Sequence, residues 1–258
     1  MLLAGLALAV STPDAWACET PDNVTRVRGG KECLVIKTFG QRTEKAPVLA
    51  VFIHGDGSSG GASDYLSRSA EKVAQNGVIG VVLIRPGYYD SEKNTSTGTS
   101  YRNEGDGYLP QIVDSVAAAV QELKTHHGAA RTVLIGHSGG AAISAVMLGR
   151  YPGIAEAAVL AACPCHIDEW RGRGGRRPWH RSQSPHSFVS GIASGTKVIA
   201  ITGGADDNTF PSLAKNYIGA LTKRGLEGDF IEVSGIDHNR VTRTAEFEEA
   251  IQRLIAAP

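Results

Sequence analysis

The stretch RTVLIGHSGG, from Arg131 to Gly140, carries the pattern that decides the fold. It begins as a short apolar run typical of a β-strand, and an alanine-rich stretch with helical character follows over residues 139–150. Gly136 and Gly140 flank Ser138 at a distance of two residues, which fits the G-x-S-x-G pattern of a sharp strand-to-helix turn. Glycine is needed at both positions because neighbouring chain segments come too close for side chains. We therefore predict that Ser138 Oγ projects from the carboxyl edge of a sheet. The alternative is an ordinary serine at a glycine-rich helix N-cap.

The rest of the chain alternates between short apolar runs and helical patterns. Most of the apolar runs are continuous, as expected for strands that are buried on both faces of a parallel sheet. The predicted strands span residues 48–54, 78–85, 132–136, 157–162, 197–202 and 230–233, and the predicted helices span 63–76, 110–126, 139–150, 211–224 and 244–256. The turn dipeptide Gly29-Gly30 between residues 25–28 and 33–39 predicts an opening β-hairpin. This order predicts an α/β fold with one mostly parallel central sheet that is covered by helices on both faces.

The composition is that of an ordinary globular protein. The 258 residues are enough for one sizeable core, and 42% hydrophobic with 20% charged residues indicates neither a disordered chain nor a membrane bundle. Lysine plus arginine equals aspartate plus glutamate at 26 each, so the charge gives no argument for nucleic acid as a partner. We expect one domain and no nucleic-acid partner, and the sequence predicts no particular oligomeric state.

The N-terminal residues resemble an export signal. An apolar run at residues 2–10 is followed by Ala15-Trp16-Ala17, a small-x-small cleavage pattern, although the positively charged start of such signals is missing. The run is far shorter than the ~20 residues of a transmembrane helix, so we expect no stable membrane insertion. We predict a signal peptide at residues 1–17, a domain at 18–258, and a secreted or periplasmic protein. In that oxidising compartment Cys18 is expected to form a disulfide with Cys33; a lipidated Cys18 is the weaker alternative, because Ala-Trp-Ala matches a lipidation site poorly.

Ser138 needs two partners before it can act as a nucleophile. A histidine must accept the hydroxyl proton, and a carboxylate must orient that histidine. On a turn of this kind the chain order is serine, acid, histidine. Of the eight histidines, only His238 follows the strand at 197–202 that should carry the acid. Asp206 and Asp207 both lie just beyond that strand, whereas Asp237 would have to fold back on its own backbone to reach the histidine.

Three segments together resemble a known family. GHSGG at 136–140, GGADDNTFP at 203–211 and GIDHN at 235–239 are similar, in this order, to the α/β-hydrolase fold. The similarity is to the small members related to dienelactone hydrolases and to the catalytic domains of prolyl oligopeptidases, and it covers the chain from about residue 48 to the end. It implies that Asp206 is the acid of the triad and that Asp207 caps or orders its loop. The region 163–184 carries no pattern specific to the family.

The resemblance also gives a role to the loop HGDGSSGG at residues 54–61. In these hydrolases the residue after His-Gly donates its backbone N–H to the oxyanion, which points to Asp56, with Gly57 as its neighbouring alternative. The second donor is expected to be the N–H of Gly139, directly after the nucleophile.

The same loop fits the spacing G-x-G-x-x-G of a dinucleotide-binding turn, so an NADP-binding protein is an alternative. Asp56 would then put a carboxylate beside the pyrophosphate, and the helix begins only near residue 63. The next strand ends in Arg85, which could suit a 2′-phosphate but not a ribose hydroxyl. This alternative also leaves the GHSGG segment and His238 without a role.

Two long loops, at residues 86–109 and 163–184, are expected to shape the substrate site, since ligands bind at the carboxyl ends of such strands. The candidate substrate-binding residues are Tyr88 and Tyr89, with Tyr101 and Tyr108 nearby, in the first loop and Trp170 and Trp179 in the second. The second loop also carries five arginines, Arg171, Arg173, Arg176, Arg177 and Arg181, so it could form a basic and aromatic lid. A solvated loop with tryptophans packed on the core is the alternative.

The segment Cys163-Pro164-Cys165-His166 could suggest a metal or haem site, but a haem motif has two residues between its cysteines, and zinc needs further ligands. We expect a local disulfide or two buried thiols, and no metal.

Taken together, these patterns predict an exported serine hydrolase that cleaves small-molecule carboxylic esters through an acyl-enzyme, with Ser138, His238 and Asp206 as its triad. It should need neither a metal nor an organic cofactor. A peptidase or amidase of the prolyl oligopeptidase type is the main alternative, and esters are favoured because the sequence shows no propeller-type domain that would select peptides. A non-catalytic binding module on the same fold is the other alternative.

Overall fold

A computed structural model of the chain describes residues 18, 20–41, 47–57, 61–101 and 106–257. The predicted signal peptide at 1–17 lies outside the described residues, and so do Ser58, Ser59 and Gly60 of the glycine-rich loop.

The described residues form one eight-stranded sheet with the order β1-β2-β4-β3-β5-β6-β7-β8. The strands are β1 (Arg26–Gly29), β2 (Glu32–Phe39), β3 (Val48–Ile53), β4 (Val78–Leu83), β5 (Arg131–His137), β6 (Ala157–Ala161), β7 (Lys197–Gly203) and β8 (Glu227–Val233). β1 and β2 pair antiparallel as the predicted hairpin, and β2 joins β4 antiparallel. All pairings from β4 to β8 are parallel, which confirms the mostly parallel sheet.

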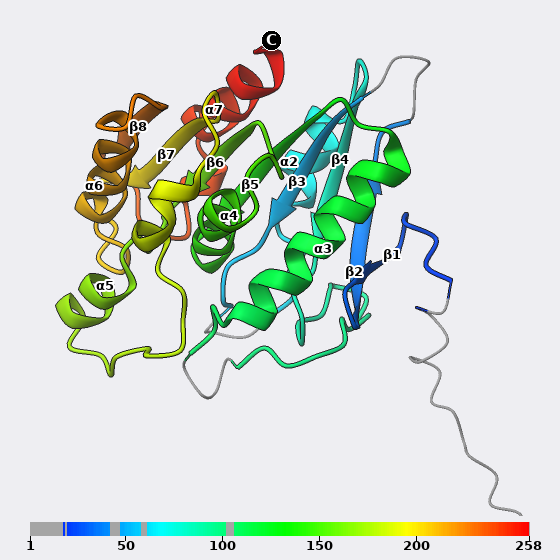
Figure 1. Cartoon of the computed structure of the whole chain (residues 1–258), viewed down its shortest axis with the longest axis horizontal. Coiled ribbons are helices and arrows are strands. Elements are labelled where there is room, and N and C mark those ends of the chain that lie inside the picture. The colour runs from blue at the N-terminus through cyan, green and yellow to red at the C-terminus, as the bar shows by residue number, and fades with distance from the viewer. Residues whose placement is uncertain (1–17, 19, 42–46, 58–60, 102–105, 258) are drawn as a thin grey trace, which may run out of the picture.

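Helices cover both faces of this sheet (Figure 1). The helices are α2 (Ser67–Val73), α3 (Pro110–His127), α4 (Gly139–Arg150), α5 (Ile167–Arg173), α6 (Pro211–Thr222) and α7 (Ala245–Ala256), with 3-10 turns η1 (Pro185–Gly191) and η2 (Val241–Arg243). α3, α4 and α6 pack on one face, in front of the sheet in Figure 1, and α2 and α7 pack on the other. This arrangement confirms the α/β-hydrolase fold predicted from the sequence.

Strand β3 shows why the apolar runs are continuous. Leu49, Val51 and Ile53 point into the core under α3 and α4, whereas Ala50 and Phe52 point into the core under α2 and α7. All five side chains are fully buried. Because successive side chains of a strand point to opposite faces, a strand covered on both sides has no polar positions to alternate with.

Three elements differ from the prediction. The helix predicted at 63–76 is shorter, because its chain turns at Asn76 and Gly77, both with positive φ. β8 begins at Glu227, three residues before the predicted start at residue 230, because an edge strand keeps exposed polar positions and lacks a continuous apolar run. The loop predicted at 163–184 contains the short helix α5, whose first turn is capped by the side chain of His166.

Two disulfides are present. Cys18 bonds to Cys33 and ties the start of the domain to β2, and Cys163 bonds to Cys165 directly after β6. Of the two states expected for Cys163 and Cys165, a local disulfide or two buried thiols, the structure shows the disulfide. No helix within the described ranges is long and apolar enough to cross a membrane.

Candidate active site

Ser138 lies in a strained turn between β5 and α4. Its backbone has φ 52° and ψ −119°, a left-handed conformation that is uncommon for a residue with a side chain. A Cβ atom on Gly136 would lie 2.5 Å from Ala141 Cα, and one on Gly140 would lie 2.0 Å from the carbonyl oxygen of Ile53. The chain approach inferred from the sequence therefore exists at both glycines. The N–H of Ser138 donates to the carbonyl of Ala161 at 2.8 Å, which fixes the turn against β6.

The structure brings Ser138, His238 and Asp206 together in one hydrogen-bonded chain. His238 Nε2 lies 3.0 Å from Ser138 Oγ, and His238 Nδ1 lies 2.9 Å from Asp206 Oδ2. The three residues follow the carboxyl ends of β5, β8 and β7, respectively, so the parallel sheet places them at one edge.

Asp206 is held in place by its own loop. Its Oδ1 accepts hydrogen bonds from the backbone N–H groups of Asn208 and Thr209, and its Oδ2 accepts one from the Thr209 hydroxyl at 2.7 Å. Burial alone would raise the pKa of this carboxyl, but the hydrogen bonds from His238 and Thr209 outweigh burial and hold the pKa below its ordinary value. The carboxylate is therefore ionised at neutral pH and accepts the Nδ1–H of His238.

The two other candidate carboxylates are oriented differently. Asp207 is exposed on the rim of the cleft. Asp237 accepts hydrogen bonds from the backbone of Asn239 and Arg240 and pairs with the Arg240 side chain at 2.7 Å. The geometry thus identifies Asp206, and neither Asp207 nor Asp237, as the carboxylate hydrogen-bonded to His238, a distinction that sequence spacing alone could not make.

A second hydrogen-bonded chain, absent from the sequence-based prediction, links the loop after β3 to the loop of His238. The N–H of Gly55 donates to the Tyr65 hydroxyl at 2.8 Å, and that hydroxyl donates to Nδ1 of His137 at 2.6 Å. His137 Nε2 then donates to the carbonyl of His238 at 3.0 Å. Burial and the nearby charge of His238 lower the pKa of His137 to about 4, so its ring is neutral and can accept on one nitrogen and donate from the other.

Asp56 lies beside the Ser138 turn, and its carboxylate is paired with a buried arginine. Arg85 Nη1 and Nη2 each lie 3.0 Å from Asp56 Oδ1, and the Tyr108 hydroxyl donates to Oδ2 at 2.6 Å. Arg85 is only 1% exposed, and its Nη1 also donates to the carbonyl of His54. Because Arg85 is buried and held by Asp56, it is not available to bind the 2′-phosphate that the NADP alternative requires.

The two predicted oxyanion donors lie close together. A Cβ atom on Gly139 would be only 2.1 Å from Asp56 Oδ1, so the two residues are in direct contact. Within the described part of the chain, neither the N–H of Asp56 nor that of Gly139 donates to another group. Gly57, the alternative donor, lies on the same cleft. The assignment of the donors stays a prediction.

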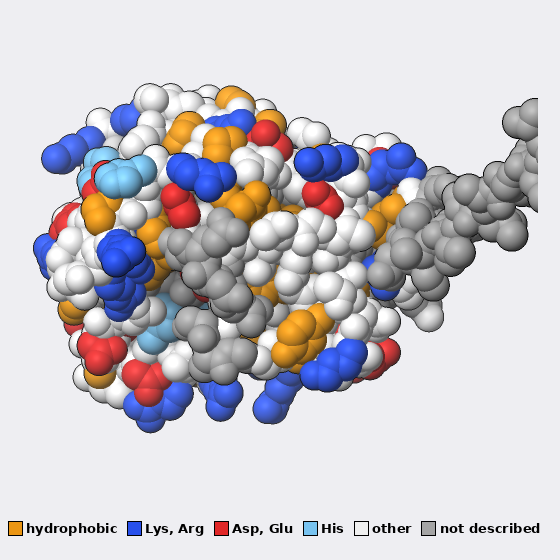
Figure 2. All heavy atoms as spheres, turned by 90° about the horizontal axis from the view of Figure 1, so that it is seen from below, with side chains coloured by type: hydrophobic (Ala, Val, Ile, Leu, Met, Phe, Trp, Pro, Cys, Tyr) orange, Lys and Arg blue, Asp and Glu red, His pale blue; other side chains and the backbone are white. Residues whose placement is uncertain are grey.

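A cleft of about 750 Å³ opens above Ser138 and His238. Figure 2 views the molecule from the carboxyl ends of the strands and shows a hollow on this face with Lys and Arg side chains at its border. Of the tyrosines and tryptophans predicted to bind substrate, Tyr88, Tyr101, Trp170 and Trp179 line the cleft, whereas the Tyr108 hydroxyl is hydrogen-bonded to Asp56. Tyr89 does not line the cleft: its ring packs against Lys93, and its backbone bridges to Thr95.

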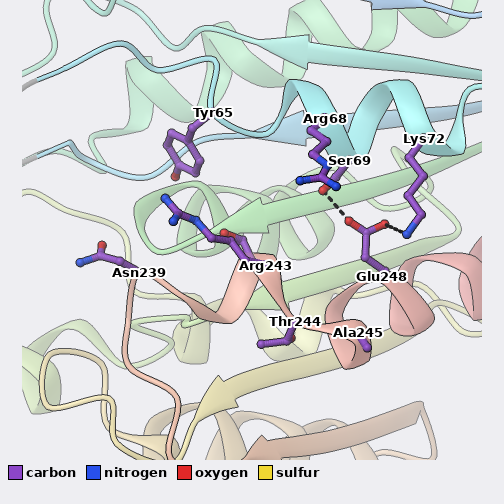
Figure 3. Close-up of a pocket in the computed structure, with 10 residues that line it drawn as sticks. Tyr65, Arg68, Ser69, Lys72, Asn239, Arg243, Thr244, Ala245 and Glu248 are labelled. Carbon is purple, nitrogen blue, oxygen red and sulfur yellow. Dashed lines mark hydrogen bonds and ion pairs between the residues drawn. The ribbon is translucent and has the colours of Figure 1, made fainter.

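A smaller pocket of about 460 Å³ adjoins the cleft (Figure 3). The two cavities share Tyr65, Asn239 and Arg243. At the far end of the pocket, Glu248 accepts a hydrogen bond from Ser69 and pairs with a lysine of α2. This pocket could not be predicted from the sequence, because most of its residues come from α2, η2 and α7, which are far apart in the chain and show no shared motif.

Within the described ranges, no group of three or more His, Cys, Asp or Glu side chains is placed to hold a metal ion. Cys163 and Cys165 are bonded to each other, and His166 caps α5.

A comparison with protein families agrees with the fold. Residues 51–185, which are 135 of the 258 residues, match the family model described as alpha/beta hydrolase fold. The chain belongs to this family. No curated protein matches it in sequence.

Solved structures of several hydrolases share the architecture. An esterase, Est2, from the Planctomycetes species Thermogutta terrifontis with bound propionate has a TM-score of 0.63 at 16% identity, and the match covers 92% of this chain and 97% of that chain. A serine hydrolase without lid from Xanthomonas campestris has a TM-score of 0.60 at 17% identity, with 90% and 94% covered. The acylaminoacyl peptidase of Pyrococcus horikoshii has a TM-score of 0.67 at 15% identity, with 88% of this chain covered. This chain spans only 40% of that peptidase.

The buried, neutral His137 predicts a pH dependence of stability. Its pKa is about 4 in the folded protein and 6.5 for a free histidine, so between these values the unfolded chain binds more protons. The free energy of unfolding should therefore fall as the pH drops through this window, by roughly 2 kcal/mol at pH 5 from this residue. Urea unfolding at pH 7 and pH 5 tests this, with His137→Gln as the reference. The variant should lose less stability on acidification than the wild type, and an equal loss would show that His137 is not the group involved.

Proposed function

We propose that this protein is a serine hydrolase that cleaves carboxylic esters through an acyl-enzyme intermediate. The observation that carries the proposal is the continuous chain from Ser138 Oγ through His238 to Asp206, with distances of 3.0 and 2.9 Å. A histidine that is oriented by a carboxylate is the group that makes a serine hydroxyl nucleophilic. The cleft of about 750 Å³ above Ser138 is the size of a small-molecule site.

The proposed reaction has two halves. Ser138 Oγ attacks the ester carbonyl carbon while His238 Nε2 accepts the hydroxyl proton, and the ionised Asp206 stabilises the resulting imidazolium. The tetrahedral intermediate collapses when His238 gives this proton to the departing alcohol, which leaves an acyl group on Ser138. A water molecule, deprotonated by the same histidine, then attacks the acyl carbon, and the carboxylic acid leaves as the serine recovers its proton.

The negative charge on the tetrahedral oxygen needs donors, and we assign the N–H groups of Asp56 and Gly139 to it. The start of α4 at Gly139 adds the positive end of a helix dipole. The carboxylate of Asp56 would oppose this charge if it were unpaired. Its ion pair with Arg85 and its hydrogen bond from Tyr108 remove that obstacle, since the pair as a whole is neutral.

Esters are proposed as the substrates because the cleft above Ser138 has the volume of a small-molecule site, and esterases are among the similar structures. The match to the Est2 esterase covers nearly all of both chains, whereas the match to acylaminoacyl peptidase covers 40% of that protein. A peptidase or amidase remains the second candidate, because the TM-score of 0.67 to the peptidase is as high as that to the esterases.

Replacement of Ser138 tests its role as the nucleophile. Ser138→Ala should lower kcat/KM for p-nitrophenyl butyrate by a factor on the order of 10⁴ or more, because the covalent route is lost. A fluorophosphonate should label wild-type enzyme at Ser138 and leave the variant unlabelled. Ser91→Ala, at an exposed serine that does not line the cleft, is the matched control. Undiminished turnover by Ser138→Ala would refute the mechanism and favour a non-catalytic role for this fold. A p-nitroanilide of the same acyl group separates esterase from amidase.

Replacement of each of the two adjacent aspartates tests which one is the acid of the triad. Asp206→Asn should lower kcat by roughly 10³- to 10⁴-fold, because an asparagine cannot stabilise the imidazolium. Asp207→Asn, which removes an exposed carboxylate one residue away, should stay within about threefold of wild type, as surface substitutions usually do. Steady-state kinetics with the same ester measures both. A larger loss in the Asp207 variant would reverse the assignment.

We also propose that the protein is exported to the periplasm or the medium. The proposal rests on the apolar start of the sequence and on two disulfides, which persist in oxidising compartments. N-terminal sequencing of protein recovered outside the cytoplasm should give a mature chain that begins at Cys18. A chain that retains Met1 in that fraction would show that residues 1–17 are not removed.

A further inference from the structure

Two arginines of the segment around α5 lie on tryptophan faces at the rim of the cleft that contains Ser138. The guanidinium carbon of Arg171 is 4.7 Å from the ring centre of Trp179 and 5.4 Å from that of Trp170. The guanidinium carbon of Arg176 is 5.3 Å from the ring centre of Trp170. All four side chains line the cleft. The aromatic rings hold the two cations in place without neutralising them.

Neither cation has a carboxylate partner among the residues that the structure describes. Arg173, between them in sequence, pairs with Glu169 at 2.6 Å, whereas Arg171 donates only to the backbone carbonyl of Arg177. The charge of Asp106 acts to raise the pKa of Arg171, but the Asp106 carboxylate accepts hydrogen bonds from the N–H of Arg181 and from a serine hydroxyl. Among the described residues, the two like charges therefore lie near each other and neither is paired with a carboxylate.

Among the described residues that line the cleft, positive side chains outnumber negative ones. Both guanidinium carbons lie within 5.4 Å of the Trp170 ring centre, so the two positive charges are close enough to repel each other. In agreement with this geometry, burial and then the charge of Arg176 lower the pKa of Arg171. Arg243 adds a third cation to the lining. Among the described lining residues the carboxylates are Asp56, which is paired with Arg85, and Asp207, which no arginine neutralises. An anion bound between Arg171 and Arg176 would relieve the repulsion and gain charge-assisted hydrogen bonds.

We propose that Arg171 and Arg176 form a subsite for a carboxylate on the substrate, so that the preferred substrates are esters that carry a second, ionised carboxyl group. The guanidinium groups bind the carboxylate, and Trp170 and Trp179 pack on the part of the substrate next to it. This inference rests on the proposed esterase function, because it names the class of ester that the cleft takes.

The subsite is tested first by binding, without turnover. In the Ser138→Ala background, the affinity for monophenyl adipate is compared with that for phenyl hexanoate, which has a methyl group in place of the carboxylate, by calorimetry or by the fluorescence of the cleft tryptophans. We expect the anionic ester to bind roughly 10- to 100-fold more tightly, the range of a charge-assisted contact. Monophenyl succinate and monophenyl suberate, which have shorter and longer acyl chains, then show how far from Ser138 the carboxylate is bound. In 4-carboxyphenyl butyrate the carboxylate is on the leaving group, so this ester tests whether the subsite takes the alcohol part of the substrate.

The variants assign the preference to these two residues. The anionic-to-neutral affinity ratio should fall at least about tenfold in the double variant Arg171→Gln/Arg176→Gln and by a smaller factor in each single variant. It should persist in Arg177→Gln, whose exposed side chain lies in the same segment but does not line the cleft. The preference should also weaken as NaCl is raised, which needs no variant.

Equal affinity for monophenyl adipate and phenyl hexanoate, with no preference on the alcohol side either, would overturn the subsite. A preference that survives in the double variant would overturn the assignment to Arg171 and Arg176. Failure of the proposed hydrolase function would appear separately, as wild-type enzyme that binds these esters but hydrolyses neither and is not labelled by a fluorophosphonate.

Discussion

The close approach of the Ser138 turn to the end of β3 is the constraint on which the site depends. Gly140 lies so near the carbonyl of Ile53 that no side chain fits, and the left-handed backbone of Ser138 turns its hydroxyl out of the sheet. β3 and β5 are neighbours in the sheet, so the loop after β3 must pass directly over this turn. Asp56 reaches Gly139 for this reason, and His238 and Asp206 meet the serine because their strands end at the same edge.

This close approach also places a negative charge, the carboxylate of Asp56, beside the turn that carries Ser138. The carboxylate of Asp56 touches the start of α4, where the proposed reaction develops negative charge, and an unpaired carboxylate there would repel it. Arg85 neutralises Asp56, yet a guanidinium that is 1% exposed is itself unfavourable unless paired. Each charge therefore requires the other. Removing Asp56 would leave a buried guanidinium unpaired, and removing Arg85 would leave a half-buried carboxylate beside the start of α4. The end of β4 and the loop after β3 therefore constrain each other's residue types.

Local signals in the sequence predicted the fold, Ser138 and His238, whereas Asp206 was preferred over Asp207 only because of the family resemblance. Continuous apolar runs and the glycines around Ser138 report directly on burial and close approach, and chain order selected His238 among eight histidines. The sequence could not show what meets across long separations. Tyr65 and His137 are 72 positions apart in the chain and carry no motif. Tyr88 and Tyr89 are adjacent in sequence, yet Tyr88 lines the cleft and the ring of Tyr89 packs against Lys93. Helix α5 was not predicted because its glycine, Gly172, and its charged residues are also typical of a loop.

The arginines show most clearly why residue type alone does not give function. Arg85 ends a predicted strand and could be interpreted as a phosphate ligand, but the structure buries it against Asp56, where it contributes no accessible charge. Arg171 and Arg176 look like members of an ordinary solvated basic loop, yet they lie on tryptophans at the rim of the cleft without a carboxylate partner in the described part of the chain. Coulomb energy depends on the partner and the local dielectric and not on the residue type. The charges that can select a ligand are therefore those that the fold leaves uncompensated beside the nucleophile, and these were visible only once the loop was placed in space.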